Sequence, residues 1–342
     1  MIHVVKIEEA VGCALAHDIT EIRPGEFKGP AFRKGYVLRS NDLEHLRRLG
    51  KNHLYVLKPE PDQIHEDEAA EALAHALCGE GVGWDQAPSE GKINLKATRD
   101  GLLKVDTEAL MRFNMLGEVM CATRHTHTVV KKGDVLAGTR AIPLMVSRTM
   151  VQYAIDAARS TAEGVLRVIL MKKALAGVVI TGNEVYYGRI QDKFEPVIRK
   201  KVSRFHGDVL DVVFVPDDEA LIAEAVLTMV ERGANVIITT GGMSVDPDDR
   251  TRFALEKAGA REMVYGSAVL PGAMFMVGYL QDVPLLGIPA CGMYAGATVF
   301  DLIYPRVLAG EKITRADVAR LGHGGLCLNC HTCRFPDCAF GK

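Results

Sequence analysis

The second half of the chain alternates short, strongly apolar segments with amphipathic ones, and this alternation restricts the fold more than any other feature. Strands that are buried on both faces of a helix-covered parallel sheet are apolar along their whole length. We therefore predict an α/β domain at residues 165–310, built on a doubly wound, mostly parallel sheet. Its expected strands are residues 165–171, 177–180, 209–215 and 236–240, with further strand pieces between 263 and 286, and its expected helices are 192–206, 218–232, about 248–258 and 294–308.

The first half of the chain shows a weaker, mixed pattern. We expect residues 1–160 to form an α+β region that could divide into two small domains, consistent with 342 residues at about 150 per domain. A helix is expected from residue 43 to Gly50, a strand at 52–57 and a second helix at 66–78. No catalytic signature stands out in this half. Residues 322–342 form a third segment, a cysteine-rich tail.

Charge and hydropathy exclude several classes of partner. The chain has 41 Lys and Arg against 43 Asp and Glu, so no net positive charge draws it to nucleic acid or to an anionic membrane. Its most apolar stretch, residues 164–181, contains Arg167, Lys172 and Lys173, and no run reaches the roughly 18 apolar residues that span a bilayer. The amino terminus lacks the pattern of a secretory signal, so we expect a cytoplasmic protein.

Three glycine-containing loops each follow an apolar strand and precede a helix: residues 181–184, 240–244 and 287–292. Loops of this kind lie together at the carboxyl edge of a parallel sheet, where ligands bind. Glycine lets the backbone N–H groups approach an anion, which predicts a phosphorylated ligand; the alternative is that the glycines only make tight turns. The expected ligand-binding residues are Thr181, Gly182, Asn183, Thr240, Gly241, Gly242, Ser244, Asp246, Asp248, Pro289 and Gly292.

Five carboxylates follow the same strands in the sequence. Their oxygens, with phosphate oxygens and water, suit Mg²⁺, which would offset the charge of a diphosphate. For Asp192 and Asp248 helix capping is an equal alternative, because each stands at an expected helix start. We favour a functional role for Glu184 and Asp249. The five carboxylates are Glu184, Asp192, Asp246, Asp248 and Asp249.

The tail carries four cysteines at the spacing Cys327-x2-Cys330-x2-Cys333-x4-Cys338. Four thiolates in so short a segment suit a tetrahedral zinc or an iron–sulfur cluster, and a reducing cytoplasm favours metal over disulfides. The alternatives are a zinc knot that only ties down the terminus and a metal-free, oxidisable tail. We expect this tail to be separate from the crevice formed by the three loops.

Several motifs together resemble the molybdopterin-binding domain shared by molybdopterin molybdotransferases of the gephyrin E-domain type, molybdopterin adenylyltransferases and the competence-damage-inducible protein A family. The resemblance covers about residues 174–310. It rests on Thr181-Gly182-Asn183-Glu184, on residues 188–192, on Thr239-Thr240-Gly241-Gly242-Met243-Ser244-Val245 through Asp249-Arg250-Thr251, and on Gly287-Ile288-Pro289. The sequence departs from the family pattern in four places. Asn183 replaces an acidic residue, Lys193-Phe194 replaces Ser-Asn after Asp192, Leu270 replaces a lysine, and Pro289-Ala290-Cys291-Gly292 replaces Pro-Gly-Asn-Pro.

The resemblance implies binding of molybdopterin or its adenylylated form at the sheet edge, with Mg²⁺ and with molybdate as a further substrate. Glu184, Asp192 and Asp249 would be catalytic, holding metal or orienting the diphosphate, while the glycine loops cradle phosphate or pterin. We expect an enzyme that inserts molybdate and releases AMP. The alternatives are a non-catalytic pterin carrier or sensor, and a nucleotide-diphosphate hydrolase on the same fold. A homo-oligomer and a molybdoenzyme apoprotein as partner are also expected.

Overall fold

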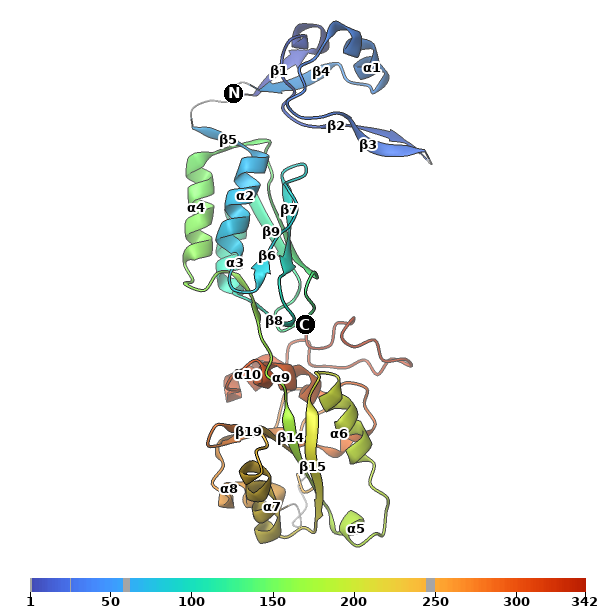
Figure 1. The fold of residues 1–342 in the computed structure, drawn as a ribbon, viewed down its shortest axis with the longest axis vertical. Helices are drawn as coiled ribbons and strands as arrows, with labels where there is room; N and C mark the ends of the chain where they lie inside the picture. Colours follow the sequence, from blue (N-terminus) through green and yellow to red (C-terminus); the bar gives the residue numbers. More distant parts are fainter. Residues whose placement is uncertain (1, 25, 58–61, 244–249) are drawn as a thin grey trace. The chain divides into compact units, whose positions relative to one another are not determined.

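A computed structural model describes residues 2–24, 26–57, 62–243 and 250–342. The chain divides into two compact units, Met1–Ile169 and Leu170–Lys342 (Figure 1). Within the described ranges, every helix is too short or too polar to cross a membrane. The expected Ser244, Asp246, Asp248 and Asp249 of the second glycine loop lie outside the described residues.

The first unit begins with a small subdomain around its own core, which includes Ile7, Leu15, Leu38 and Leu46. The strand expected at 52–57 forms as β4, and the helix expected from residue 43 forms as α1. The elements are β1 (Ile2–Lys6), η1 (Ile7–Ala10), β2 (Ile19–Arg23), β3 (Phe27–Phe32), η2 (Ser40–Asp42), α1 (Leu43–Arg48) and β4 (His53–Leu57), with β1 antiparallel to β4 and β2 antiparallel to β3.

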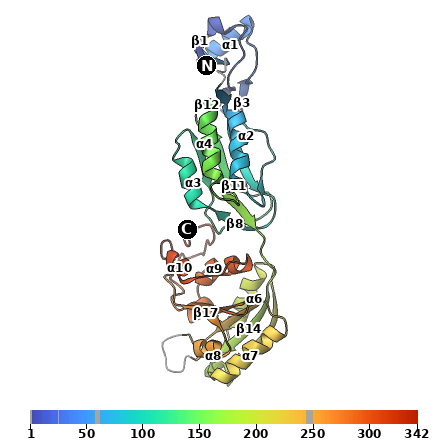
Figure 2. The ribbon, with the colours of Figure 1, turned by 90° about the vertical axis from the view of Figure 1, so that its left-hand side faces the viewer.

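The rest of the first unit packs helices on antiparallel sheets around a second core that contains Leu73, Leu77 and Phe113 (Figure 2). The strand orders are β6-β7-β11-β9, β10-β8-β13 and β12-β5. The elements are β5 (Gln63–His65), α2 (Glu66–Leu77), β6 (Val82–Gly83), β7 (Lys92–Ala97), β8 (Gly101–Val105), α3 (Thr107–Asn114), β9 (Val119–Thr123), β10 (Val129–Val130), β11 (Val135–Ala141), β12 (Met145–Ser147), α4 (Arg148–Arg159) and β13 (Leu166–Ile169).

The second unit contains a six-stranded mixed sheet in the order β15-β14-β16-β19-β18-β17. The first four strands are parallel to one another, and β18 and β17 extend the sheet in antiparallel fashion. The expected mixed α/β character of this domain is confirmed. The strands are β14 (Leu175–Thr181), β15 (Asp208–Val215), β16 (Val236–Thr240), β17 (Arg261–Tyr265), β18 (Met276–Leu280) and β19 (Val283–Ile288).

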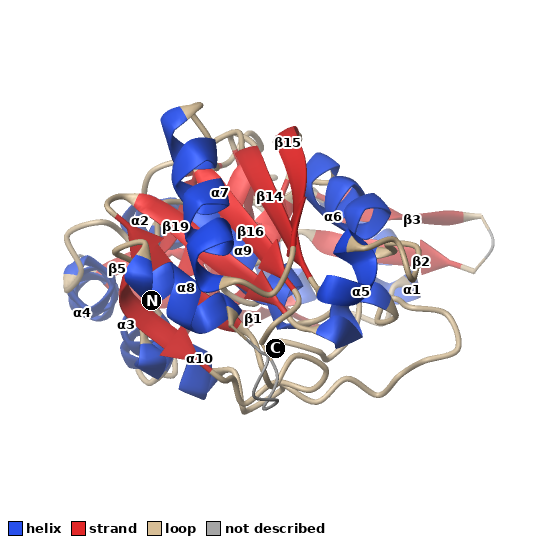
Figure 3. Ribbon diagram, turned by 90° about the horizontal axis from the view of Figure 1, so that it is seen from below, coloured by secondary structure: helices blue, strands red, loops and turns tan. Residues whose placement is uncertain are grey.

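Helices cover both faces of this sheet, and alternate side chains of each strand enter different cores (Figure 3). On β14, Val178 and Ile180 pack with α6 and α9, whereas Val179 packs with α7 and α8. This two-sided burial explains why the strands are apolar throughout. The helices are α5 (Asn183–Tyr186), α6 (Phe194–Ser203), α7 (Glu219–Glu231), α8 (Thr251–Lys257), η3 (Ala290–Met293), α9 (Val299–Leu308) and α10 (Arg315–Arg320).

Two expectations about this unit are corrected. The strand expected at residues 165–171 forms as β13, but it pairs antiparallel with β8 in the first unit, so the α/β sheet begins with β14. The helix expected from residue 294 begins only at Val299, because Thr298 and Asp301 form a capping box that fixes its start.

Candidate functional site

The three glycine loops leave neighbouring parallel strands at the same edge of the sheet. Strands β14, β16 and β19 are adjacent, and their ends are in register, with Ile180 opposite Thr240 and Thr240 opposite Ile288. The polar loop residues therefore emerge side by side at the carboxyl edge, as the pattern of strands and helices predicts.

Buried threonine hydroxyls fasten the first loop to the second. Thr181 Oγ1 donates to the carbonyl oxygen of Thr240 at 3.1 Å, and Thr251 Oγ1 donates to the carbonyl oxygen of Gly241 at 3.0 Å. The two hydroxyl oxygens lie 3.1 Å apart. Since Thr181 and Thr251 are almost completely buried, these bonds form in a region of low dielectric constant and hold the loop backbone rigidly.

The two glycines of the second loop are required by its own packing. Gly241 and Gly242 have φ angles of +80° and +55°, in the left-handed region that glycine adopts most easily. A Cβ at Gly241 would collide with the carbonyl oxygen of Thr181, and one at Gly242 would collide with the hydroxyl of Thr251. The tight-turn alternative therefore accounts for these glycines, whether or not a ligand also approaches them.

A pocket of about 460 Å³ opens between the second and third loops. Of its described lining residues only Cys291 carries an ionisable side chain, and partial burial raises the pKa of its thiol, which keeps it neutral. The pocket is therefore apolar, with polar character supplied by the backbone, and its size is typical of a small-molecule site. It is lined by Gly241, Gly242, Met243, Leu270, Pro271, Gly272, Ala273, Met274, Pro289, Ala290 and Cys291.

The wall formed by residues 270–274 was not predicted as part of the site. It lies between β17 and β18, inside the range 263–286 in which the sequence predicts strand pieces, and its Leu270 stands where the family pattern has a lysine. The Pro271-Gly272 pair is a turn signal that could have drawn attention to it. Gly272 is needed there, because a Cβ would lie 2.5 Å from Cγ1 of Val299.

The described carboxylates differ in what they contact. Both oxygens of Asp192 accept backbone N–H groups, from Phe194 at 3.0 Å and from Glu195 at 2.8 Å, so the helix-capping interpretation applies to this residue. Glu184 is exposed on the short helix α5, where its carboxyl group folds back toward Gly182. Asn183 braces two loops instead: its N–H donates to Asp217 at 2.9 Å, and its Oδ1 accepts the N–H of Asp217 at 3.3 Å.

The cysteine tail lies against the site and not apart from it, contrary to expectation. The N–H of Leu270 donates to the carbonyl oxygen of Gly325, and the N–H of Cys327 donates to the carbonyl oxygen of Leu270, both at 2.8 Å. Cys333 packs against Gly296, which follows the third loop. The tail therefore bonds both the N–H and the carbonyl group of Leu270, which lines the pocket.

The tail thiols do not converge. Cys330 and Cys333 are exposed, whereas Cys327 and Cys338 are partly buried beside Phe340 in the core under α9. In the part of the chain that the structure describes, no three His, Cys, Asp or Glu side chains gather closely enough to hold a metal ion. Metal binding by the tail stays a prediction.

Residues 177–310 match the model of the probable molybdopterin binding domain, and residues 4–58 match a domain of unknown function (DUF8806). The chain is 26% identical over 321 residues to the molybdopterin molybdenumtransferase of Haemophilus influenzae, covering 90% of this chain and 73% of that protein. This chain resembles the molybdopterin-binding domain proteins, as its motifs predict.

Other relatives are similar over shorter stretches. A CinA-like protein of Mycobacterium tuberculosis is 34% identical over 91 residues, which are 27% of this chain and 21% of that protein. Among solved structures, the molybdopterin biosynthesis enzyme MoaB of Thermus thermophilus matches with a TM-score of 0.34 at 20% identity, covering 40% of this chain and 98% of that one. The molybdopterin biosynthesis Mog protein of Mycobacterium ulcerans gives 0.35 at 21% identity with the same coverages.

Proposed function

We propose that this protein acts in molybdenum cofactor biosynthesis and binds molybdopterin or adenylylated molybdopterin in the pocket at the carboxyl edge of its doubly wound sheet. The pocket of about 460 Å³ within the matched domain is the observation that carries the proposal. A flat pterin ring suits walls such as Met243, Leu270 and Met274, while backbone groups of the glycine loops can bond its polar edge.

The leading reaction is the insertion of molybdate with release of AMP. Mg²⁺ would offset the negative charge of the diphosphate when bound. In this proposal Glu184 and Asp249 supply oxygen ligands to the ion, and Asp192 holds the start of α6 through the two N–H groups that it accepts. The backbone N–H groups of Gly241 and Gly242 hold the leaving phosphate in a fixed position, which lowers the entropic cost of reaction.

One observation favours a non-catalytic alternative, a pterin carrier or sensor. Apart from Cys291, the described lining has no ionisable side chain, and Leu270 stands where the family pattern has a lysine. Without a fixed cation at this wall, the pocket can bind a neutral ring more readily than it can stabilise charge that develops during reaction.

The test uses the purified full-length chain and adenylylated molybdopterin under anaerobic conditions. AMP released only when molybdate is present supports insertion. AMP released without molybdate indicates hydrolysis of the diphosphate, and tight binding without turnover supports the carrier. If the pterin nucleotide neither binds nor reacts, with Mg²⁺ present, the assignment of this pocket is wrong.

We also propose that Cys327, Cys330, Cys333 and Cys338 hold one zinc ion or an iron–sulfur cluster. The support is the spacing and chemistry of the four thiols, two of which are freely accessible. Elemental analysis of anaerobically purified protein tests this, and a reduced protein with neither zinc nor iron would refute it. The homo-oligomer and the molybdoenzyme partner stay predictions.

A further inference from the structure

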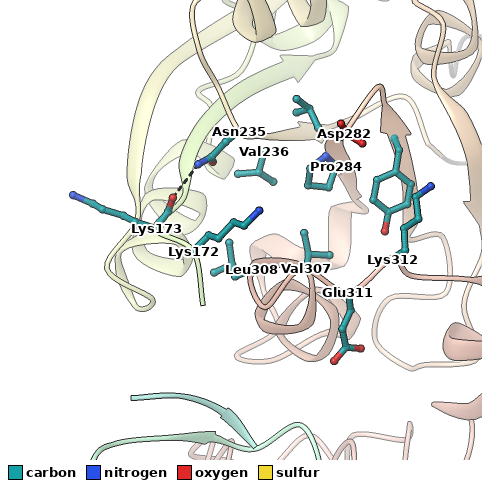
Figure 4. Close-up of a pocket in the computed structure, with 13 residues that line it drawn as sticks. Lys172, Lys173, Asn235, Val236, Asp282, Pro284, Val307, Leu308, Glu311 and Lys312 are labelled. Carbon is teal, nitrogen blue, oxygen red and sulfur yellow. Dashed lines mark hydrogen bonds between the residues drawn. The ribbon is translucent and has the colours of Figure 1, made fainter. Parts of the chain in front are cut away.

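A second pocket, of about 540 Å³, lies at the opposite edge of the same sheet. It forms where the parallel strands β16 and β19 begin and where α9 ends, whereas the glycine loops follow the strands' carboxyl ends (Figure 4). Its lining residues belong only to the second unit: Lys172, Lys173, Asn235, Val236, Tyr279, Asp282, Val283, Pro284, Val307, Leu308, Gly310, Glu311 and Lys312.

The body of this pocket is apolar with one aromatic wall. Val236, Pro284, Val307 and Leu308 supply aliphatic surface, and the ring of Tyr279 is almost fully buried. The Tyr279 hydroxyl oxygen accepts the N–H of Ile313 at 2.6 Å. Burial raises the pKa of this phenol, so it keeps its proton near neutral pH and its O–H can donate a hydrogen bond to a ligand.

Most charged groups around the pocket are already paired. Lys173 contacts Asp208 at 2.7 Å, Lys312 contacts Glu262 at 2.6 Å and Glu311 contacts Arg306 at 2.8 Å. The hydrogen bond to Glu262 is the main cause of the raised pKa of Lys312, and the negative charge of Asp282 adds a smaller contribution.

Lys172 is different: among the described residues, no carboxylate lies within ion-pair distance of its ammonium group. Its backbone N–H donates to the carbonyl oxygen of Leu308 at 2.7 Å, which fixes the residue at the end of α9. Figure 4 shows its side chain extending toward Val236 and Leu308, two of the aliphatic residues that line the pocket.

We propose that this pocket is a second small-molecule site, for an amphipathic anion with a flat apolar or aromatic body and one carboxylate or phosphate group. The apolar walls would bury the body, Lys172 would pair with the anionic group, and Tyr279 would donate a hydrogen bond. An unpaired lysine at a helix carboxyl end also has a plain electrostatic explanation, favourable interaction with the helix dipole, which predicts no ligand binding.

The experiment uses the full-length chain with labelled Val and Leu methyl groups and phenyl phosphate as the probe, followed by NMR. We expect saturable shifts at the methyl groups of Val236, Val307 and Leu308, with no shift at Leu270 in the other pocket. Benzyl alcohol, which lacks the charge, and inorganic phosphate, which lacks the ring, should each bind more weakly than phenyl phosphate. Shifts confined to Leu270, or no shift anywhere, would overturn the proposal.

A matched pair of variants tests the role of the lysine. Lys172→Met removes the charge but keeps an unbranched side chain that is only one atom shorter. It should weaken phenyl phosphate binding about fivefold, with little effect on benzyl alcohol, because mainly the ion pair is lost. Lys257→Met, at the exposed end of α8, should change neither affinity. Equal phenyl phosphate affinity in Lys172→Met and Lys257→Met would show that Lys172 does not bind the anion and only interacts with the dipole at the carboxyl end of α9. The outcome does not depend on whether the carboxyl-edge pocket binds a pterin.

Discussion

The threonine hydroxyls beneath the glycine loops allow a direct test of what holds the candidate site together. Thr251→Val preserves the β-branched shape but removes the donor to the carbonyl oxygen of Gly241, a bond of 3.0 Å. That partly buried carbonyl loses its partner, and Thr181 loses a polar neighbour at 3.1 Å. A buried acceptor left unsatisfied costs about 1–3 kcal/mol, so we expect the free energy of unfolding of the second unit to fall by about that amount.

The control is Thr239→Val, two residues before Gly241 on β16. The Thr239 hydroxyl is also buried but has no hydrogen-bond partner among the described groups. Replacing it by a methyl group should leave stability unchanged or raise it by about 1 kcal/mol, because an unsatisfied polar atom is removed. The two variants, although chemically identical changes, should therefore differ by about 1–4 kcal/mol.

Hydrogen exchange of peptides that span β16 and α8 measures this difference in stability directly in the second structural unit of the chain. Tryptophan fluorescence would not serve, because the single tryptophan, Trp84, lies in the first unit. Thr251→Val should accelerate exchange at the second glycine loop and lower affinity for pterin nucleotide, while Thr239→Val should do neither. Equal protection in the two variants would refute the argument that this hydroxyl network fixes the loop.

Three further predictions follow from other buried or exposed groups. Lys201→Met should lower the unfolding free energy of the second unit by about 3–5 kcal/mol in denaturant titrations, because it leaves Asp301 charged, buried and without its ammonium partner. Burial raises the pKa of Asp317, but hydrogen bonds from Thr314 and Arg306 outweigh it and lower the pKa to about 2. The stabilisation from Asp317 is therefore present above its unfolded pKa of about 4 and should be lost as pH falls toward 2, a loss that Asp317→Asn should remove from acid-unfolding curves. In metal-free protein, iodoacetamide should modify the exposed Cys330 and Cys333 before Cys121, whose pKa burial raises to about 12, as peptide mass mapping can check.

The central strands of the α/β unit were predictable because burial on both faces leaves a continuous apolar run. The strand expected at 236–240 forms as β16 with the same bounds, and β14 extends the strand expected at 177–180 by a few residues. The apolar pattern could not show which sheet the segment around 165–171 joins, because an apolar strand looks the same in a sheet of the first unit and in the sheet of the second unit. Its partner, β8, lies some 60 residues earlier, and such distant antiparallel pairing leaves no local signal.

The three glycine loops of the site could be predicted from the sequence, but the wall formed by residues 270–274 could not. Strand order and register follow from topology rules, so the three loops could be expected to meet at one edge. The interpretation of Asp192 depended on whether its oxygens face the backbone, and they accept two N–H groups of α6. The capping box of Thr298 and Asp301 was visible in the sequence but lay inside an apolar run that reads as one longer helix.

The contact between tail and pocket changes how the cysteines bear on the proposed function. Leu270 replaces a cation of the family pattern, and its N–H and carbonyl group bond Gly325 and Cys327 at the start of the cysteine segment. A ligand that orders this segment therefore also orders one wall of the pocket, because the same backbone hydrogen bonds belong to both. The pocket wall that carries Leu270 in place of the family's lysine is therefore the wall that the tail holds in place.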